Sequence, residues 1–183
     1  MAKIYNQELI YKLCDYPPYR KLGEINPDTT NDTYRVMDLK NPEAPNHNKA
    51  VKHFGEGFAA GTVRIADSLD VDKVQIAIVP SSEKGKRSEG LEAIVKLAVG
   101  VKAVYDPLFL NRDVTVSKSH LGGDRSLEKH INSISVHNTP KADIPLILLD
   151  DVTTTGKTMN ACAQILKDAG VNNIFKVAIG KTI

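Results

Sequence analysis

The chain has 183 residues, a length that fits a single domain able to bury a hydrophobic core. Its 24 basic and 22 acidic residues leave a net charge of +2, so the overall charge points to neither nucleic acid nor an anionic membrane as a partner. No segment approaches membrane-spanning length, and the N-terminus lacks the apolar run and cleavage site of a secretory signal. The two cysteines, Cys14 and Cys162, show no metal-binding or secretory spacing. These features predict a cytoplasmic protein with buried, reduced thiols.

Residues 1–48 differ in composition from the rest of the chain. They contain five of the six tyrosines and most of the prolines, including YPPY and NPEAPN. This composition predicts a short helix followed by hairpin-like extended segments such as Thr33–Leu39. We therefore expect residues 1–48 to form an appendage, or hood, on an α/β core made by residues 49–183.

Helical and strand patterns follow one another from Lys49 onward. Apolar residues at helical spacing predict a long amphipathic helix that Asp70 ends. The run VQIAIVP at 74–80 is rich in β-branched residues and stops at a proline, which predicts a buried strand. After a polar loop, SSEKGKRSEG, the expected elements are a helix at Leu91–Val99, a brief strand at Val101–Val104 and, within the polar region 105–140, extended structure at Ile131–His137.

The C-terminal part gives the clearest patterns. LILLD at 146–150 predicts a second buried strand, and Ile174–Ile179 predicts a third. Between them, Lys157–Ala169 predicts an amphipathic helix that Gly170 terminates. Strands that alternate with helices predict an α/β fold with a mostly parallel sheet and helices on both faces.

The segment LILLDDVTTTGKT, residues 146–158, joins a predicted strand to a predicted helix through two acids and a threonine-rich turn. A nucleotide-binding P-loop needs glycine, four residues, and then Gly-Lys-Ser/Thr, but Asp151 stands at the first glycine position. A carboxylate there would repel the phosphates that the loop binds, so we do not expect a P-loop ATPase. A different phosphate cradle and an ordinary polar turn remain as alternatives.

The same segment offers groups that suit a phosphorylated sugar. The start of a helix supplies free amide groups and a partial positive charge, and the threonine hydroxyls add donors for one phosphate. The carboxylates of Asp150 and Asp151 suit sugar hydroxyls or a hard cation such as Mg²⁺. An ordinary turn would explain one or two threonines but not two acids at the end of an apolar strand. The segment therefore predicts a site for ribose 5-phosphate.

LILLDDVTTTGKT resembles the phosphoribosyl pyrophosphate (PRPP) signature of the type I phosphoribosyltransferases. The longer run DDVTTTGKTMNACAQILKDAGVNNIFKVAIGKT is most similar to the ComF branch, although the N-terminal zinc-binding cysteines of that branch are absent. Arg112, Arg125 and Asn132 echo an Arg- and Asn-containing stretch that precedes the signature there. The resemblance extends over about 74–183 and implies a three-layer type I phosphoribosyltransferase fold, with a mostly parallel sheet and a small hood.

The resemblance also implies a reaction and a set of site residues. The reaction is displacement of pyrophosphate from the anomeric carbon of PRPP by a nitrogen nucleophile, with Mg²⁺ as cofactor. In the loop after the first strand, a solvated turn is the alternative to pyrophosphate binding. The implied residues are Asp150 and Asp151 for the ribose hydroxyls, catalysis and Mg²⁺; Thr153, Thr154, Thr155, Gly156, Lys157 and Thr158 for the 5-phosphate; and Ser81, Ser82, Lys84 and Arg87 for pyrophosphate.

Thr154 bears on the identity of the acceptor. Hypoxanthine-type enzymes carry an acid at this position, and threonine is a poor general base at neutral pH. Salvage of hypoxanthine or guanine is thus disfavoured, while pyrimidine chemistry stays open. A homodimer is one assembly that the sequence allows. The alternative function is a binding or regulatory module that keeps the PRPP site without transfer. The stretch SHLGGDR at 119–125 predicts either a lid or a surface turn.

Overall fold

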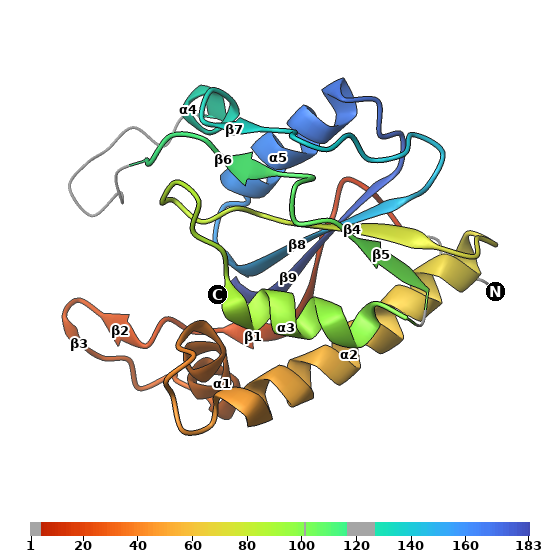
Figure 1. Cartoon of the computed structure of the whole chain (residues 1–183). Coiled ribbons are helices and arrows are strands. Elements are labelled where there is room, and N and C mark those ends of the chain that lie inside the picture. The colour runs from red at the N-terminus through yellow and green to blue at the C-terminus, as the bar shows by residue number, and fades with distance from the viewer. Residues whose placement is uncertain (1–4, 101, 117–126) are drawn as a thin grey trace.

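The computed structural model describes residues 5–100, 102–116 and 127–183, and its centre is a sheet of five parallel strands (Figure 1). Each neighbouring pair in this sheet runs parallel. Because Ile78 lies beside Leu149 in the register, the segments that follow these two strands meet at the same edge of the sheet. In spatial order the strands are β1 (Ile10–Tyr16), β9 (Ile174–Thr182), β8 (Leu146–Thr153), β4 (Val74–Ile78) and β5 (Ala103–Tyr105).

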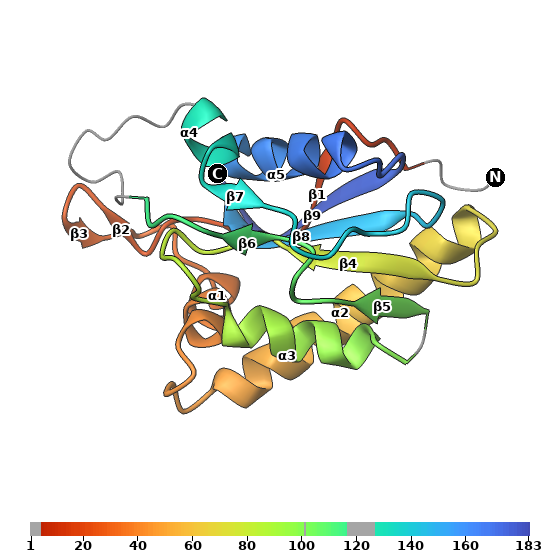
Figure 2. The same ribbon diagram turned by 45° about the horizontal axis from the view of Figure 1, so that its top comes forward.

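Helices cover both faces of the sheet, as Figure 2 shows. Helices α1 (Asn31–Lys40), α2 (His47–Ser68) and α3 (Glu89–Ala98) lie on one side, and α4 (Leu127–Ile131) and α5 (Lys157–Asp168) lie on the other. The predicted α/β fold, with a parallel sheet between layers of helices, is confirmed.

The strand β8 shows why the sequence gives three layers. Its first four residues are all buried, because successive side chains point to opposite faces and both faces are covered. Ile147 and Leu149 join the core beneath α1, α2 and α3, whereas Leu146 and Leu148 join the core beneath α5. The alternation continues along the strand, so it also decides which face each of the following acids meets.

The elements predicted from Lys49 onward are found close to their expected positions. The strand β8 continues through Thr153 and β9 through Thr182, each three residues past the predicted end. In the polar region, the predicted extended segment Ile131–His137 holds only the short strand β7 (Ile134–Ser135), which pairs with β6 (Asn111–Arg112). The stretch 119–125 lies outside the described residues. None of the helices in the described ranges is long and apolar enough to cross a lipid bilayer.

The N-terminal segment differs most from expectation. The prediction that Thr33–Leu39 is extended is wrong, because these residues lie within α1. Thr30 caps this helix by accepting a hydrogen bond from the amide of Thr33, whose hydroxyl in turn accepts from the amide of Thr30. Val36 and Leu39, three residues apart, are then fully buried. The strand β1 pairs with β9, so this part of residues 1–48 belongs to the central sheet rather than to an appendage. A small hairpin of β2 (Arg20–Lys21) and β3 (Glu24–Ile25) projects beside α1.

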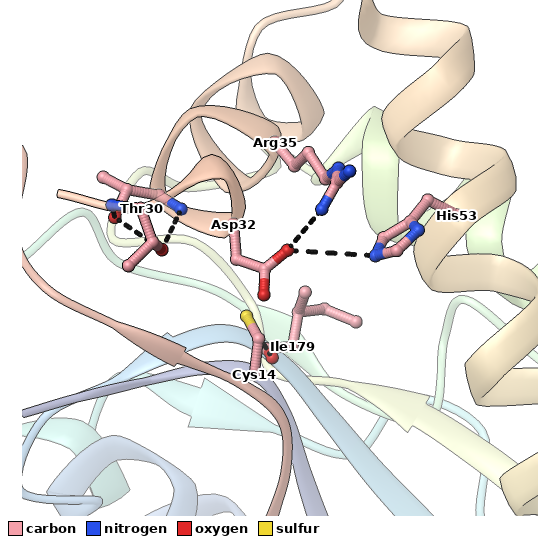
Figure 3. Close-up of polar contacts among 7 residues, drawn as sticks. Cys14, Thr30, Asp32, Arg35, His53 and Ile179 are labelled. Atoms are coloured by element: carbon pink, nitrogen blue, oxygen red, sulfur yellow. Dashed lines mark hydrogen bonds and ion pairs between the residues drawn. The ribbon is translucent and has the colours of Figure 1, made fainter.

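Polar contacts fix α1 to the rest of the fold (Figure 3). The Asp32 carboxylate lies 2.8 Å from Arg35 and 3.9 Å from Nε2 of His53, so it joins the start of α1 to α2. Beneath it, the thiol of Cys14 in β1 donates a hydrogen bond to the carbonyl of Ile179 at 3.3 Å. Burial raises the pKa of Cys14 to about 11, so this thiol is a structural group rather than a nucleophile.

Candidate functional site

Two adjoining clefts lie at the carboxyl edge of the sheet. The larger, of about 600 Å³, is lined by the loop after β4, by the end of α1 and by part of β8. The smaller, of about 300 Å³, is lined by the turn between β8 and α5. Asp150, His130 and Thr158 line both, so the clefts meet at these side chains. This edge is where ligands of open α/β sheets usually bind. Six predicted residues line the larger cleft: Ser81, Ser82, Arg87, Asp150, Asp151 and Thr158.

The two acids point in different directions because they are neighbours on one strand. Asp150 follows the alternation of Leu148 and faces the α5 side, whereas Asp151 faces the α1 side. There the ammonium group of Lys40, the last residue of α1, lies 3.2 Å from Oδ2 of Asp151. The amide of Asp151 donates to Oδ1 of Asp150 at 2.8 Å, which fixes the first carboxylate against the backbone.

The environment of Asp150 disfavours its ionised form. Burial, and then the neighbouring charge of Asp151, raise the pKa of Asp150 above the ordinary carboxyl value, although the charge of Lys40 opposes this. A cation bound beside Asp150 would favour its ionised form. Raised carboxyl pKa values of this kind are typical of functional clefts.

Two carboxylates that face a cleft form a donor set that fits Mg²⁺, since this ion is often held by one or two carboxylates together with oxygens of its ligand. Among the described residues, no group of three or more His, Cys, Asp or Glu side chains could hold a metal ion. Asp150 and Asp151 would therefore hold Mg²⁺ together with oxygens of a bound phosphate ester rather than as a closed protein site.

The predicted phosphate-binding residues all line the smaller cleft. Thr153 is buried at the end of β8, while Thr155 and Lys157 are exposed. The hydroxyl of Thr154 lies 3.2 Å from that of Thr182. The cap residue at the start of α5 is Gly156, which has no side chain to accept a hydrogen bond from the amides of the first turn. These amides face the cleft region with the partial positive charge of a helix N-terminus.

Gly156 adopts a conformation that other residues avoid. Its φ is +72°, in the left-handed region, where a Cβ atom causes steric conflict. An added Cβ would also lie 2.5 Å from Cδ1 of Ile10, the first residue of β1. The glycine therefore lets the turn fold tightly between the strand and the helix.

The loop after β4 contributes side chains that are partly held by protein contacts. Arg87 lies 3.6 Å from Glu92 and donates to Asn111 at 3.4 Å. Lys84 is exposed and does not line the larger cleft, in which Lys86 is found instead. Three of the four predicted residues of this loop therefore line the same cleft as the acid pair, and Lys84 does not.

The clefts are also lined by Arg112, His130 and Lys40, which were not among the predicted site residues. Arg112 is only 4% exposed, and its guanidinium donates a hydrogen bond to the carbonyl of Ser81 at 2.9 Å. This bond holds the loop after β4 in position. His130 places Nε2 3.3 Å from the hydroxyl of Thr158. Lys40 meets Asp151. Arg112 was visible in the sequence as part of an Arg-containing stretch, but nothing marked Lys40, which directly follows the segment Thr33–Leu39 that was expected to be extended.

Comparison with protein-family models and with curated proteins finds no match. Among solved structures, the chain is similar to a purine phosphoribosyltransferase from Pyrococcus horikoshii Ot3 at 16% sequence identity and a TM-score of 0.37. The match covers 73% of this chain and 86% of that one. A sequence identity and a TM-score this low do not indicate a function for this chain.

Proposed function

We propose that this protein is a phosphoribosyltransferase that binds PRPP with Mg²⁺ and transfers ribose 5-phosphate to a nitrogen nucleophile, releasing pyrophosphate. The observation that carries the proposal is the position of Asp150, which lies where the two clefts meet. One cleft offers a helix N-terminus without a side-chain cap, and the other offers a polar loop with serine hydroxyls and cationic side chains. A ligand with a phosphate at one end, a diol in the middle and a diphosphate at the other matches this order of groups.

The residues of the chain have distinct tasks in this proposal. The first turn of α5 and the hydroxyl of Thr158 bind the 5-phosphate, which is an anion suited to a helix N-terminus. Asp150 and Asp151 accept hydrogen bonds from the ribose hydroxyls and favour positive charge that develops on the ring as pyrophosphate leaves. Ser81, Ser82 and Arg87 bind the departing pyrophosphate. When bound, Mg²⁺ would neutralise negative charge on the pyrophosphate.

The proposal is tested first by binding. Titration calorimetry of the protein with PRPP and Mg²⁺ should show binding, and Asp150→Asn or Asp151→Asn should each weaken it by about 1–3 kcal/mol, the range for losing hydrogen bonds to charged groups. Asp143→Asn, at an exposed loop residue outside both clefts, is the matched control and should bind like the wild type. Micromolar ATP binding that is lost in Lys157→Ala, together with no binding of PRPP, would contradict the proposal.

A second measurement separates an enzyme from a binding module. Pyrophosphate release is followed with PRPP, Mg²⁺ and a panel of nucleobases and amines, which would also identify the acceptor. Release that depends on one acceptor and is lost in both Asp→Asn variants supports transfer. Tight PRPP binding without release for any acceptor would instead support a regulatory module that binds PRPP.

A further inference from the structure

Helix α1 is fixed at both ends, which gives its last residue a defined position. At its start, Asp32 contacts His53 of α2 (Figure 3). At its end, Leu39 is only 1% exposed and lies directly against the first turn of α3. An added Cβ at Gly90 would be 2.2 Å from the carbonyl oxygen of Leu39, so α1 approaches α3 as closely as a glycine allows. The residue after Leu39 is therefore carried to the wall of the larger cleft.

That residue is Lys40, and its ammonium group lies 3.2 Å from Oδ2 of Asp151. The two side chains are 41% and 28% exposed, so the pair lies at the wall of the cleft and not in the core. Asp150 and Asp151 are adjacent carboxylates, and without a nearby cation their charges would repel each other and any anionic ligand. Lys40 supplies such a cation from the protein itself.

We propose that Lys40 is a built-in counter-cation for Asp151, so that its ammonium group and a divalent cation compete for this carboxylate. Lys40 is then a positioning residue that lets the cleft accept a sugar phosphate when no divalent cation is bound. The proposal deepens the proposed function and rests on it for the identity of the ligand. Competition for Asp151 rests only on the ion pair that the structure shows.

The first test uses Mn²⁺ alone, followed through the electron paramagnetic resonance signal of the free ion. Lys40→Met should bind Mn²⁺ about three- to fivefold more tightly than the wild type, the size expected for removing a partly exposed competing ion pair. Lys40→Gln serves as a second uncharged variant. Lys40→Arg keeps the charge, and Lys96→Met makes the same charge change at an exposed position of α3. Both controls should match the wild type.

The second test uses ribose 5-phosphate and titration calorimetry. In a chelator, Lys40→Met should bind about fivefold more weakly than the wild type, because the uncompensated charge of Asp151 repels the phosphate ester. In saturating Mg²⁺ the difference should shrink. Equal Mn²⁺ affinities, including no measurable binding to either protein, would overturn the proposal, as would tighter binding of the sugar phosphate in the chelator. If the wild type binds no ribose 5-phosphate in either buffer, the proposed function fails, while the Mn²⁺ comparison still decides the role of Lys40.

Discussion

The hydroxyl of Thr158 lies 3.3 Å from Nε2 of His130, so the first turn of α5 is joined to α4 where the two clefts meet. Thr158→Val keeps the shape of the side chain and removes this hydroxyl. We expect the affinity for inorganic phosphate to fall about three- to tenfold, the effect of losing one hydrogen bond. Calorimetric titration with phosphate measures this. Thr62→Val is the control, since the hydroxyl of Thr62 donates within α2 to the carbonyl of Phe58 and Thr62 lines neither cleft. If Thr158→Val and the wild type bind phosphate equally well, the hydroxyl of Thr158 does not contribute to phosphate binding.

Gly156 and Gly170 both have positive φ, but their surroundings differ. Nothing lies within 4 Å of a Cβ added at Gly170, so Gly170→Ala should cost only the backbone term, about 1–2 kcal/mol. Gly156→Ala should cost about 1 kcal/mol more, because its Cβ meets Cδ1 of Ile10. Urea unfolding measures both. Ile10→Val removes Cδ1. In the Ile10→Val background, Gly156→Ala should therefore lose its extra destabilisation and cost about as much as Gly170→Ala, which a double-mutant cycle measures. If Gly156→Ala stays more destabilising than Gly170→Ala in the Ile10→Val background, contact with Ile10 is not the cause of the extra destabilisation.

Gly90 and Gly61 form another matched pair, both inside helices. A Cβ at Gly90 would collide with the backbone carbonyl of Leu39, which cannot rotate away, so Gly90→Ala should destabilise the protein by about 1–3 kcal/mol. At Gly61 the nearest atom is 3.8 Å away on the side chain of Arg64, so Gly61→Ala should stabilise α2 by about 0.5–1 kcal/mol. Chemical denaturation of the two variants measures both changes in the free energy of unfolding, which should have opposite signs. A neutral Gly90→Ala would show that α1 can move from α3 without cost.

Stability should depend on pH through Asp150. Its pKa is raised in the folded protein by burial and by the charge of Asp151, so folding favours the protonated form. The associated stability is fully present below the ordinary carboxyl pKa of about 4 and is lost as the pH rises through the folded value. The side chain of Asp150→Asn cannot ionise, so the free energy of unfolding of this variant should not fall as the pH rises. Above the folded pKa of Asp150, the variant should therefore gain stability relative to the wild type, by about 1.4 kcal/mol for each pH unit between the ordinary and the folded pKa. Unfolding curves from pH 4 to pH 8 check this. A difference between the two proteins that is constant across this range would contradict the shift.

The sequence was informative where a pattern is local. The apolar residues of LILLD predicted a buried strand, and the apolar spacing within Lys157–Ala169 predicted an amphipathic helix, because side chains that recur at the period of an element share one face. The acid pair followed from the same strand. The pattern placed Asp150 and Asp151 at one edge of the sheet without reference to any distant residue.

The sequence was misleading where position depends on distant contacts. Turn-forming composition outweighed the helical spacing of Val36 and Leu39, so α1 was missed, and with it the reason that Lys40 could reach the acids. The strand β1 is an edge strand in which three of the seven residues are partly buried, three are exposed and one is buried, so it lacks the regular alternation of apolar and polar residues that would predict a strand. His130 meets Thr158 through the packing of α4 on α5, which no local pattern encodes.

The pairing of β1 with β9 also bears on how the protein folds. Ile10 lies beside Lys176 in the register, so the strand made first has no neighbour in the sheet until the strand made last has been synthesised. Closing so long a loop costs conformational entropy before any contact is gained, which slows folding. The approach of Ile10 to Gly156 also forms only when this edge closes. Docking of β1 is therefore expected to come late in folding, so the turn between β8 and α5 acquires its contact with Ile10 near the end of the process.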